Sequence, residues 1–409
     1  MAVLAWVAAG LCLLPIGAVT LAALTGGLET VTDLAQTVLP RYARTTLAMV
    51  MIVALGTAVI GTGTAWLVTM TRFPGRRVLE IALALPLAFP AYVLAYAYTD
   101  FLDHPGWVQT SLRDLTGWGP RDYWFPEIRS LPGAAMMLVL VLYPYVYLLA
   151  RAAFLQQSAT AYLAARTLGR GPWSAFFRVS LPIARPAIAG GVLLAVMETI
   201  ADFGTVSYFN VQTFATGIYQ SWFSFADRGA AAQLALCLLM AALVFRAMPH
   251  ITLVSGYLLP FFEWNIWGIL PTTIIVLVAI NQPFTLWMLH SFFLNIPKDM
   301  DESAMVDGCT RFQAFRHVII PVMWPGVITT GLFSFLLAYN DFAVTAMLLS
   351  SENETIIPAI NSFLGTTQVE GKVMYAVAAV VSATAPLFVL ILFFQRQIVS
   401  GLTAGAVKG

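Results

Sequence analysis

Two aspartates occupy matching positions in this chain and are the residues best suited to chemistry. Asp202 and Asp341 each lie 20 residues after a proline and directly before a phenylalanine. Glu198 precedes Asp202 by about one helical turn, and Asn340 precedes Asp341 directly. An ionisable side chain at membrane depth costs about 2.5–3.5 kcal/mol on insertion scales and commonly faces a pathway or a partner. These four residues are candidates for lining a translocation path. The alternative is that the aspartates lie at the outer membrane edge and cap helix ends.

The other reactive residue types form no arrangement that predicts catalysis. Three cysteines and four histidines are scattered along the chain. Neither their spacing nor that of any nucleophile and base resembles a metal or catalytic site. The sequence also lacks the GxxxxGK[ST] motif of an ATP-hydrolysing site. We therefore expect no enzyme activity, no metal site and no cofactor bound by this chain.

A cytoplasmic-looking segment is repeated at the offset that separates Asp202 from Asp341, called the repeat offset below. From Pro144 to Phe203 the chain aligns with its later copy without a gap, with 13 identities in 60 positions. In each copy a glycine is predicted to end a helix, because glycine tolerates positive φ without strain. A short amphipathic segment follows, and we expect a proline to close it before the next span. A repeat of this kind between membrane-spanning runs predicts two fused half-transporters.

Each copy predicts a helix–turn–helix with an apolar side that fits a groove on a partner. An amphipathic loop on the membrane surface is the competing interpretation. Two copies with the same glycine-to-proline spacing favour docking. The predicted docking residues are Leu163, Ala164, Ala165, Gly169 and Pro182 in the first loop, and Glu302, Ser303, Ala304, Gly308 and Pro321 in the second.

The composition is that of an integral membrane protein. Of 409 residues, 59% are hydrophobic and 10% charged, whereas soluble domains carry roughly 25% charge. The net charge of +1 and the absence of a Lys/Arg run argue against a nucleic-acid partner. Apolar runs predict spans at about 3–24, 47–70, 81–99, 133–150, 186–208, 229–245, 269–289, 325–349 and 373–394. Prolines inside these runs are expected to kink helices rather than to bind substrate.

The orientation follows from the repeat and from the basic residues. The two loops must face the same side, so the short apolar stretch 251–264 is predicted to be a tenth crossing. With the N-terminus inside, 14 of the 21 Lys and Arg residues fall on the inside. We therefore expect an all-α polytopic protein of about ten transmembrane helices in two parallel repeats, with both termini cytoplasmic. The outside segments 100–129 and 350–372 would be the docking surface for an external partner.

The loop spacing resembles that of permease subunits of binding-protein-dependent ABC importers. It reads E-A-A, three residues, glycine, nine residues, then aliphatic-x-aliphatic-proline, complete in the second copy except for Ser303. The first copy departs at Leu163, where the family has glutamate. The resemblance implies coupling loops that dock on two cytosolic ATPase subunits, which use the ATP. It also implies an extracytoplasmic substrate-binding protein, contact with membrane lipid and a place in the bacterial inner membrane.

The two halves resemble different members of that family. The first half (1–247) is expected to hold six transmembrane helices and coupling loop 158–182, and it resembles ferric-iron permeases at 61–77, 89–103, 117–133 and 201–228. The second half (248–409) is expected to hold four transmembrane helices and coupling loop 297–321, lacking the first two helices of the family. It resembles maltose and other carbohydrate permeases at 292–326, 338–342 and the tail 400–409, which would reach between the ATPase subunits.

The substrate expected from these resemblances is ferric iron, because the iron-like half holds the outside segments at 100–132 and 209–228. A carbohydrate is the alternative, since the second half carries the more complete coupling motif. An ion-coupled secondary transporter that uses Asp202 and Asp341 is a further alternative. That mechanism would leave the cytoplasmic repeat without a role.

Overall fold

A computed structural model describes residues 17–119, 122–156, 162, 165–244, 270–293, 296, 298–349, 353–360, 378–390 and 393–394. These residues form helices and irregular segments, with no strand among them. The described helices that are long and apolar enough to cross a membrane are Leu39–Met70, Leu131–Leu155, Pro172–Ala201 and Arg311–Tyr339. The all-α class is confirmed. The predicted crossing 251–264 and the tail 400–409 lie outside the described residues, so the total of ten spans stays a prediction.

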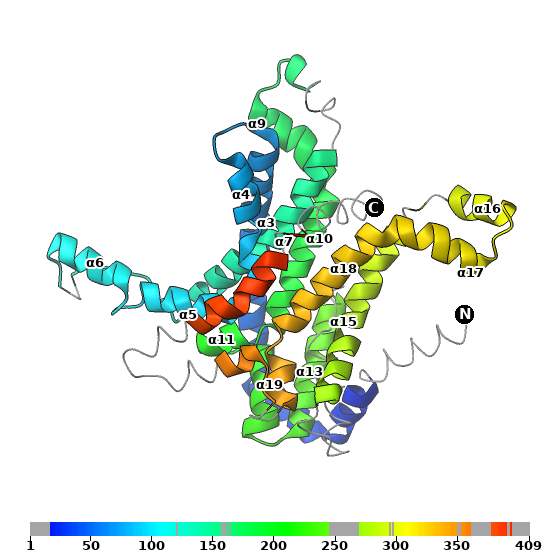
Figure 1. The fold of residues 1–409 in the computed structure, drawn as a ribbon. Helices are drawn as coiled ribbons and strands as arrows, with labels where there is room; N and C mark the ends of the chain where they lie inside the picture. The colour runs from blue at the N-terminus through cyan, green and yellow to red at the C-terminus, as the bar shows by residue number, and fades with distance from the viewer. Residues whose placement is uncertain are drawn as a thin grey trace.

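Three helices pack closely in the first half: α3 (Leu39–Met70), α7 (Leu131–Gln156) and α10 (Leu181–Ala201) (Figure 1). Val146 of α7 lies between glycines of the other two. A Cβ on Gly61 would lie 2.6 Å from the Cβ of Val146, and a Cβ on Gly191 would lie 2.6 Å from its Cα. Glycine at both positions lets the three backbones approach each other, as small residues do between membrane helices.

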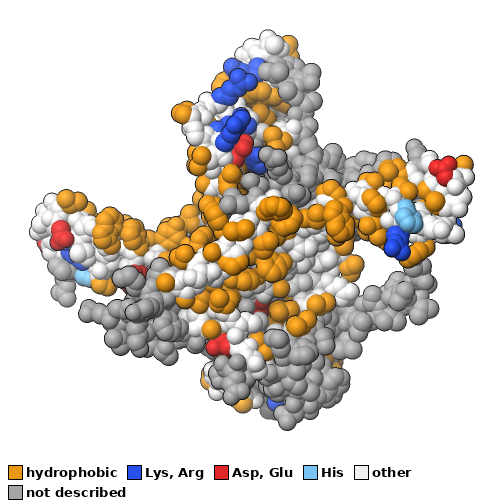
Figure 2. Space-filling model, in the orientation of Figure 1, with side chains coloured by type: hydrophobic (Ala, Val, Ile, Leu, Met, Phe, Trp, Pro, Cys, Tyr) orange, Lys and Arg blue, Asp and Glu red, His pale blue; other side chains and the backbone are white. Residues whose placement is uncertain are grey.

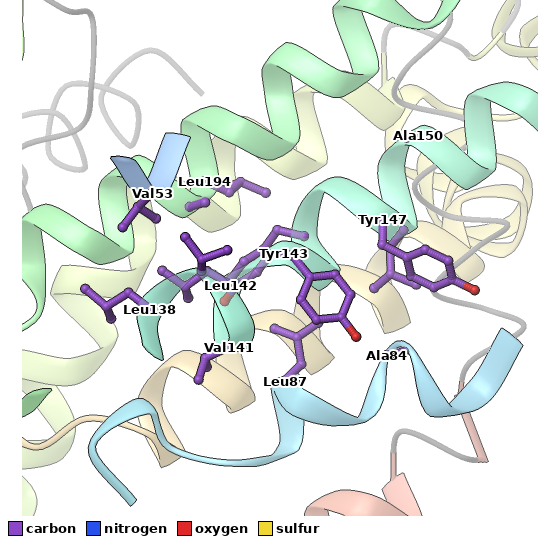
Figure 3. Close-up of a cluster of buried hydrophobic side chains, with 14 of the residues drawn as sticks. Val53, Ala84, Leu87, Leu138, Val141, Leu142, Tyr143, Tyr147, Ala150 and Leu194 are labelled. Atoms are coloured by element: carbon purple, nitrogen blue, oxygen red, sulfur yellow. The ribbon is translucent and has the colours of Figure 1, made fainter. Parts of the chain in front are cut away.

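Apolar side chains fill the space around this crossing. Figure 3 shows Leu138, Val141 and Leu142 of α7 on the side of the cluster that faces Val53 of α3 and Leu194 of α10, and all five residues are buried. The Tyr147 hydroxyl at the far end of the cluster donates a hydrogen bond to the carbonyl of Glu80 at 2.9 Å. That bond ties α7 to the short helix α4 (Arg76–Ala82).

The span predicted at 81–99 is not one continuous helix. The chain instead forms α4, a 3₁₀ turn η1 (Leu85–Ala88) and α5 (Ala91–Leu102), followed by α6 (Trp107–Thr116). The axis bends by 104° between the two parts. Pro90 stands at the N-cap of α5, and the preceding Phe89 is extended. A proline has no N–H for the helical ladder and disfavours helical geometry in the residue before it, which explains the break.

A second group of helices forms the lower part of the molecule in Figure 1. It comprises α2 (Leu28–Thr37), α12 (Phe214–Tyr219), the π-helical turn η3 (Gln220–Ser224) and α13 (Arg228–Val244). Gln233 of α13 donates hydrogen bonds to the carbonyls of Ala23 and Gly27 at 3.2 and 3.0 Å. The start of the described chain is thereby held against α13.

The repeat seen in the sequence is also a repeat of structure. Five successive pairs of elements begin at positions related by the repeat offset: α7 and α15 (Leu270–Phe293), α9 (Pro172–Ala175) and α17 (Arg311–Ala314), η2 (Phe176–Ser180) and η4 (Phe315–Ile319), α10 and α18 (Ile320–Tyr339), and α11 (Gly204–Tyr208) and α19 (Ala343–Leu348). In the second half, α16 (Lys298–Val306) precedes α17. The described chain thus holds two copies of one helical unit.

The two copies differ in what surrounds them. Helix α3 has no counterpart at the repeat offset, because residues 178–209 already belong to η2, α10 and α11. In the second copy α15 packs on α18, where a Cβ on Gly326 would lie 2.7 Å from the Phe292 ring. On α15, Ile274, Val278 and Leu286 are 52–63% exposed, whereas 83% of the apolar window of α7 is buried. The second copy is therefore less enclosed than the first.

The predicted spans 186–208 and 325–349 are also interrupted. Helix α10 ends at Ala201 and α18 ends at Tyr339, and a short helix follows each break. The breaks fall at the two repeated aspartates, which bind the backbone of the helix that follows. The aspartate positions are thus the ends of the long helices rather than points within them.

Candidate functional site

One pocket is lined by all four residues that the sequence suggested for a translocation path. Glu198 and Asp202 come from the end of α10, and Asn340 and Asp341 from the end of α18. Side chains of α7, α12 and α15 complete the wall.

The pocket lies where the two copies of the repeat meet. Seven pairs of equivalent residues line it: Val141 and Ile280, Leu142 and Asn281, Met197 and Leu336, Glu198 and Leu337, Ala201 and Asn340, Asp202 and Asp341, and Phe203 and Phe342. Phe203 and Phe342 contact each other, with ring centroids 5.8 Å apart and ring planes 11° from parallel. Contact between equivalent residues marks the axis that relates the two copies.

Each repeated aspartate caps a short helix. Asp202 accepts hydrogen bonds from the Val206 N–H at 3.0 Å and from the Thr205 hydroxyl at 2.9 Å. Asp341 accepts from the N–H groups of Val344 and Thr345 at 3.0 and 3.1 Å. These bonds satisfy donors that the first turn of a helix leaves unpaired. The two interpretations left open by the sequence are therefore compatible, because residues that cap α11 and α19 also line the pocket.

Glu198 differs from the aspartates in having no hydrogen-bond donor among the described residues. The equivalent residue in the second copy is Leu337, which also lines the pocket. The second copy contributes amides where the first copy is apolar, because Asn281 is equivalent to Leu142 and Asn340 is equivalent to Ala201. The polar groups of the pocket are thus distributed asymmetrically about an axis that relates the backbones.

Aromatic rings cover much of the remaining wall. The Tyr92 ring lies 5.9 Å from that of Phe342, and Phe203 lies 4.2 Å from Tyr219. The Tyr92 hydroxyl donates to the carbonyl of Ile357 at 2.9 Å, which fixes this ring in place. A pocket with aromatic walls and a few polar groups has the usual composition of a site for a small organic ligand.

The described residues contain no group of three or more His, Cys, Asp or Glu side chains placed to hold a metal ion. The described cysteines, Cys237 and Cys309, are unpaired and lie far apart in the chain.

The glycines of the two predicted docking loops adopt the same conformation. Gly169 has φ of 81° and Gly308 has φ of 88°. The N–H of Arg170 bonds to the Ala165 carbonyl and that of Gly169 to Arg166, both at 3.1 Å. The N–H of Cys309 bonds to Ala304 at 3.0 Å and that of Gly308 to Met305 at 3.1 Å. Both loops therefore end their first helix with a Schellman motif, which favours glycine at this position.

The proline of each loop does not close the second segment, contrary to the expectation from the sequence. Pro182 and Pro321 lie at the second residue of α10 and α18, each directly after a π-helical turn. The N–H of Leu181 bonds to Phe176 and that of Ile320 to Phe315, five residues back. In this wider turn each N–H bonds to the carbonyl five residues back instead of four. The turn ends just before the proline, which has no N–H to donate. Each amphipathic segment thus continues into its membrane helix without a break, which gives the single helices Pro172–Ala201 and Arg311–Tyr339.

Both loops present apolar side chains to the exterior. In the first loop Leu168, Trp173 and Phe177 are exposed, and in the second Val306 and Phe312 are. Figure 2 shows basic side chains near the α4–α9 end, and acidic and basic side chains together near the α16–α17 end. The small residues Ala165 and Ala304 are each 7% exposed, so they pack inward. Glu302 and Ser303 are exposed on α16, while Leu163 and Ala164 lie outside the described residues.

Sequence reasoning missed the aromatic wall and Asn281. Asn281 lies within an apolar helix, and its inward direction depends on how α15 packs against its neighbours. Comparing the two copies would have found it, because it is one of the places where polarity changes between equivalent residues.

The match to one known protein family agrees with this two-copy arrangement. The family described as "Binding-protein-dependent transport system inner membrane component" matches the chain twice, over residues 58–248 and 232–403. A solved bacterial ABC transporter involved in the import of the acidic polysaccharide alginate covers 57% of this chain and 82% of its own, with 17% identity and a TM-score of 0.46.

Several curated relatives are named for sugars. The trehalose transport permease SugB of Mycobacterium tuberculosis is 36% identical over 42% of this chain and 63% of its own length. The diacetylchitobiose uptake permease DasC of Streptomyces coelicolor is 41% identical over 35% of this chain and 51% of its own. The trehalose/maltose permease MalG of Thermococcus litoralis is 38% identical over 39% and 58%. The chain thus spans between half and two thirds of the length of these relatives.

Proposed function

Because the chain belongs to the family of binding-protein-dependent transport system inner membrane components, we propose that it forms the membrane pathway of an ATP-driven sugar importer. The substrate would be delivered by an extracytoplasmic binding protein, and ATP would be hydrolysed by separate cytosolic subunits. The carrying observation is the pocket at the junction of the two copies, where all four candidate path residues lie. In transporters built from repeats, the substrate site commonly lies at the interface between the repeats.

Carbohydrate replaces ferric iron as the proposed substrate class. The relatives described above are named for trehalose, maltose and diacetylchitobiose, and they give no support to iron. The pocket chemistry agrees with this choice. The flat C–H faces of a sugar ring suit aromatic walls, and its hydroxyls suit carboxylate and amide oxygens.

We further propose that each loop docks one ATPase subunit. The Schellman turn fixes the angle between the two short helices of each loop, and the second helix runs without a break into α10 or α18. A push on Trp173 or Phe312 would therefore pass along a single helix to the Asp202 or Asp341 end of the pocket. The loop residues Glu302, Ser303, Gly308 and Pro321, and their counterparts in the first copy, are assigned to this contact.

The test is uptake by the chain co-expressed with candidate ATPase subunits and sugar-binding proteins in sealed vesicles. We expect ATP-dependent uptake of labelled trehalose, maltose or diacetylchitobiose that persists when ion gradients are dissipated. Uptake that requires an ion gradient and no ATPase would instead support a secondary transporter. Uptake of ferric iron with a ferric-binding protein, and of no sugar, would return the assignment to iron.

The stoichiometry gives a separate test of the loops. Native mass spectrometry of the purified complex should show two ATPase subunits per chain. One subunit per chain would mean that only one loop docks, and the variant loop with Leu163 would be the first to examine.

A further inference from the structure

Glu198 is the most distinctive group in the pocket, because it is charged and unpartnered where the other copy has leucine. The carboxylates of Asp202 and Asp341 already accept hydrogen bonds from the backbones of α11 and α19. No described donor does the same for Glu198. Both of its oxygens therefore remain available to a substrate, as does Oδ2 of Asp341, because the two N–H groups of α19 both donate to Oδ1.

The charge of the pocket is entirely of one sign. Its charged lining residues are Glu198, Asp202 and Asp341, and none of the described residues that line it is Lys, Arg or His. In a site walled by aromatic and aliphatic groups, opposite and like charges act strongly on each other because little water screens them. An anionic ligand would meet repulsion from the ionised carboxylates and would find no cation among the described residues that line the pocket.

The asymmetry of the pocket gives a ligand one preferred orientation. Glu198 stands on the first copy, and the amides of Asn281 and Asn340 stand on the second. The Asn340 Oδ1 atom is buried and has no hydrogen-bond partner in the described part of the chain. A buried acceptor of this kind favours a ligand that brings a donor, since leaving it unpaired is unfavourable. Hydroxyl and ammonium groups are such donors, whereas a carboxylate or phosphate is not.

We propose that Glu198 is a specificity-determining residue that makes the pathway accept neutral and amine-bearing sugars and reject acidic ones. The proposal rests on the function proposed above and deepens it by naming the substrate class. Glu198 acts on the ligand directly, by accepting hydrogen bonds from its hydroxyl or ammonium groups and by repelling a negative charge. Leu337 provides no such carboxylate at the equivalent position of the second copy.

The test uses glucose, glucosamine and glucuronate, which share one pyranose ring and differ in charge. Their binding to the complex of the full chain with its ATPase subunits would be measured in detergent by saturation-transfer NMR, without the binding protein. We expect the wild-type complex to bind glucosamine and glucose at least ten-fold more tightly than glucuronate. A ten-fold ratio corresponds to about 1.4 kcal/mol, a modest part of what close like charges produce.

Two variants isolate the role of Glu198. Glu198→Gln keeps the size and the hydrogen-bonding oxygen but removes the charge, and should reduce the glucosamine-to-glucuronate preference by about ten-fold. Leu337→Glu places a second carboxylate at the equivalent position and should increase that preference. Asp33→Asn removes a carboxylate from the exposed face of α2 and should leave the ratio unchanged.

Equal binding of glucuronate and glucosamine by the wild type would overturn the proposal. So would a ratio that Glu198→Gln does not change, or one that Asp33→Asn changes as much. ATP-driven trehalose uptake by the wild type is measured in parallel. Uptake without the expected ratios would reject charge selection alone, whereas no uptake and no binding of any probe would reject the transport assignment as well.

Discussion

Individual glycines decide whether the two docking loops keep their shape. Gly169 and Gly308 hold positive φ, and a Cβ at either position would meet no atom within 4 Å. A substitution there would therefore act through backbone strain rather than through a clash. The left-handed conformation costs roughly 1–2 kcal/mol for a residue with a side chain.

We expect Gly169→Asp and Gly308→Asp to uncouple ATP hydrolysis from sugar uptake, because the strained turn would misplace the docking helix. Gly169→Ala should show at least as strong an effect, because alanine tolerates positive φ no better than aspartate does. Gly171→Ala is the matched control, since Gly171 lies slightly further along the same loop with φ of −62° and an equally open environment. The measurement is uptake per ATP hydrolysed in vesicles, and wild-type coupling in both aspartate variants would contradict the loop assignment.

At Asp202 and Asp341, the capping role can be separated from the charge. We expect Asp202→Ala and Asp341→Ala each to lower stability by about 1 kcal/mol, because the N-terminal N–H groups of α11 or α19 would lose their acceptor. Asp202→Asn and Asp341→Asn should retain most of that stability, since asparagine is an equally good N-cap. The midpoints of thermal unfolding in detergent distinguish the pairs. Equal losses in the Ala and Asn variants would show that the charge, not the cap, matters for folding.

On the scale of the elements, the sequence predicted the class, the repeat and the glycine turns correctly. These features are local, since they depend on apolar runs, on a constant offset and on the backbone freedom of glycine. The ends of α10 and α18 were misjudged because hydropathy does not show that Asp202 and Asp341 bind the backbone ahead of them. The role of Pro182 and Pro321 was misjudged because the preceding π-helical turn leaves no mark in composition.

The pocket itself was predicted only in part. Glu198, Asp202, Asn340 and Asp341 stand out because polar groups are unexpected at membrane depth. The contributions of Tyr92 and Asn281 depend on how α5 and α15 pack against distant helices. Tertiary packing of that kind cannot be deduced from the period of an apolar helix.

The crossing of α3, α7 and α10 gives a sharp prediction for neighbouring glycines. Gly191→Ala would place a methyl group 2.6 Å from the Val146 Cα, whereas a Cβ on Gly190 would meet nothing within 4 Å. We expect Gly191→Ala to destabilise the protein by roughly 1–3 kcal/mol, as overpacking does, and Gly190→Ala to be neutral or stabilising. Fluorescence-detected size-exclusion chromatography after heating would compare them. Similar behaviour of the two variants would show that the helices do not approach as described.

At the scale of the whole molecule, two copies of one unit differ in how fully they are enclosed. Helix α7 is surrounded by α3 and α10, whereas its counterpart α15 leaves Ile274, Val278 and Leu286 exposed. Residues with fewer buried contacts open at lower free energy. The described part of the second copy should therefore be the more mobile of the two.

Hydrogen–deuterium exchange of the full chain in lipid nanodiscs tests this difference. We expect amides in α15 to exchange faster than their equivalents in α7, with the two helices paired residue by residue as Leu142 is with Asn281. The amides of α7 serve as the internal control, because each is paired with an α15 amide at the equivalent position of the repeat. Equal protection of the two helices would mean that lipid or another subunit encloses α15 as fully as α3 encloses α7.

Among the described residues α3 has no counterpart at the repeat offset, and this difference has a mechanical consequence. If equal forces act on the two docking loops, the more enclosed α3–α7–α10 side and the less enclosed α15–α18 side deform by different amounts. The α15–α18 side, being more compliant, would make the larger displacement, while the α3–α7–α10 side would serve as the fixed reference. Phe342 would then move past Phe203, while Phe203 stays in place. ATP hydrolysis by two identical subunits would therefore move the two halves of the pathway by unequal amounts.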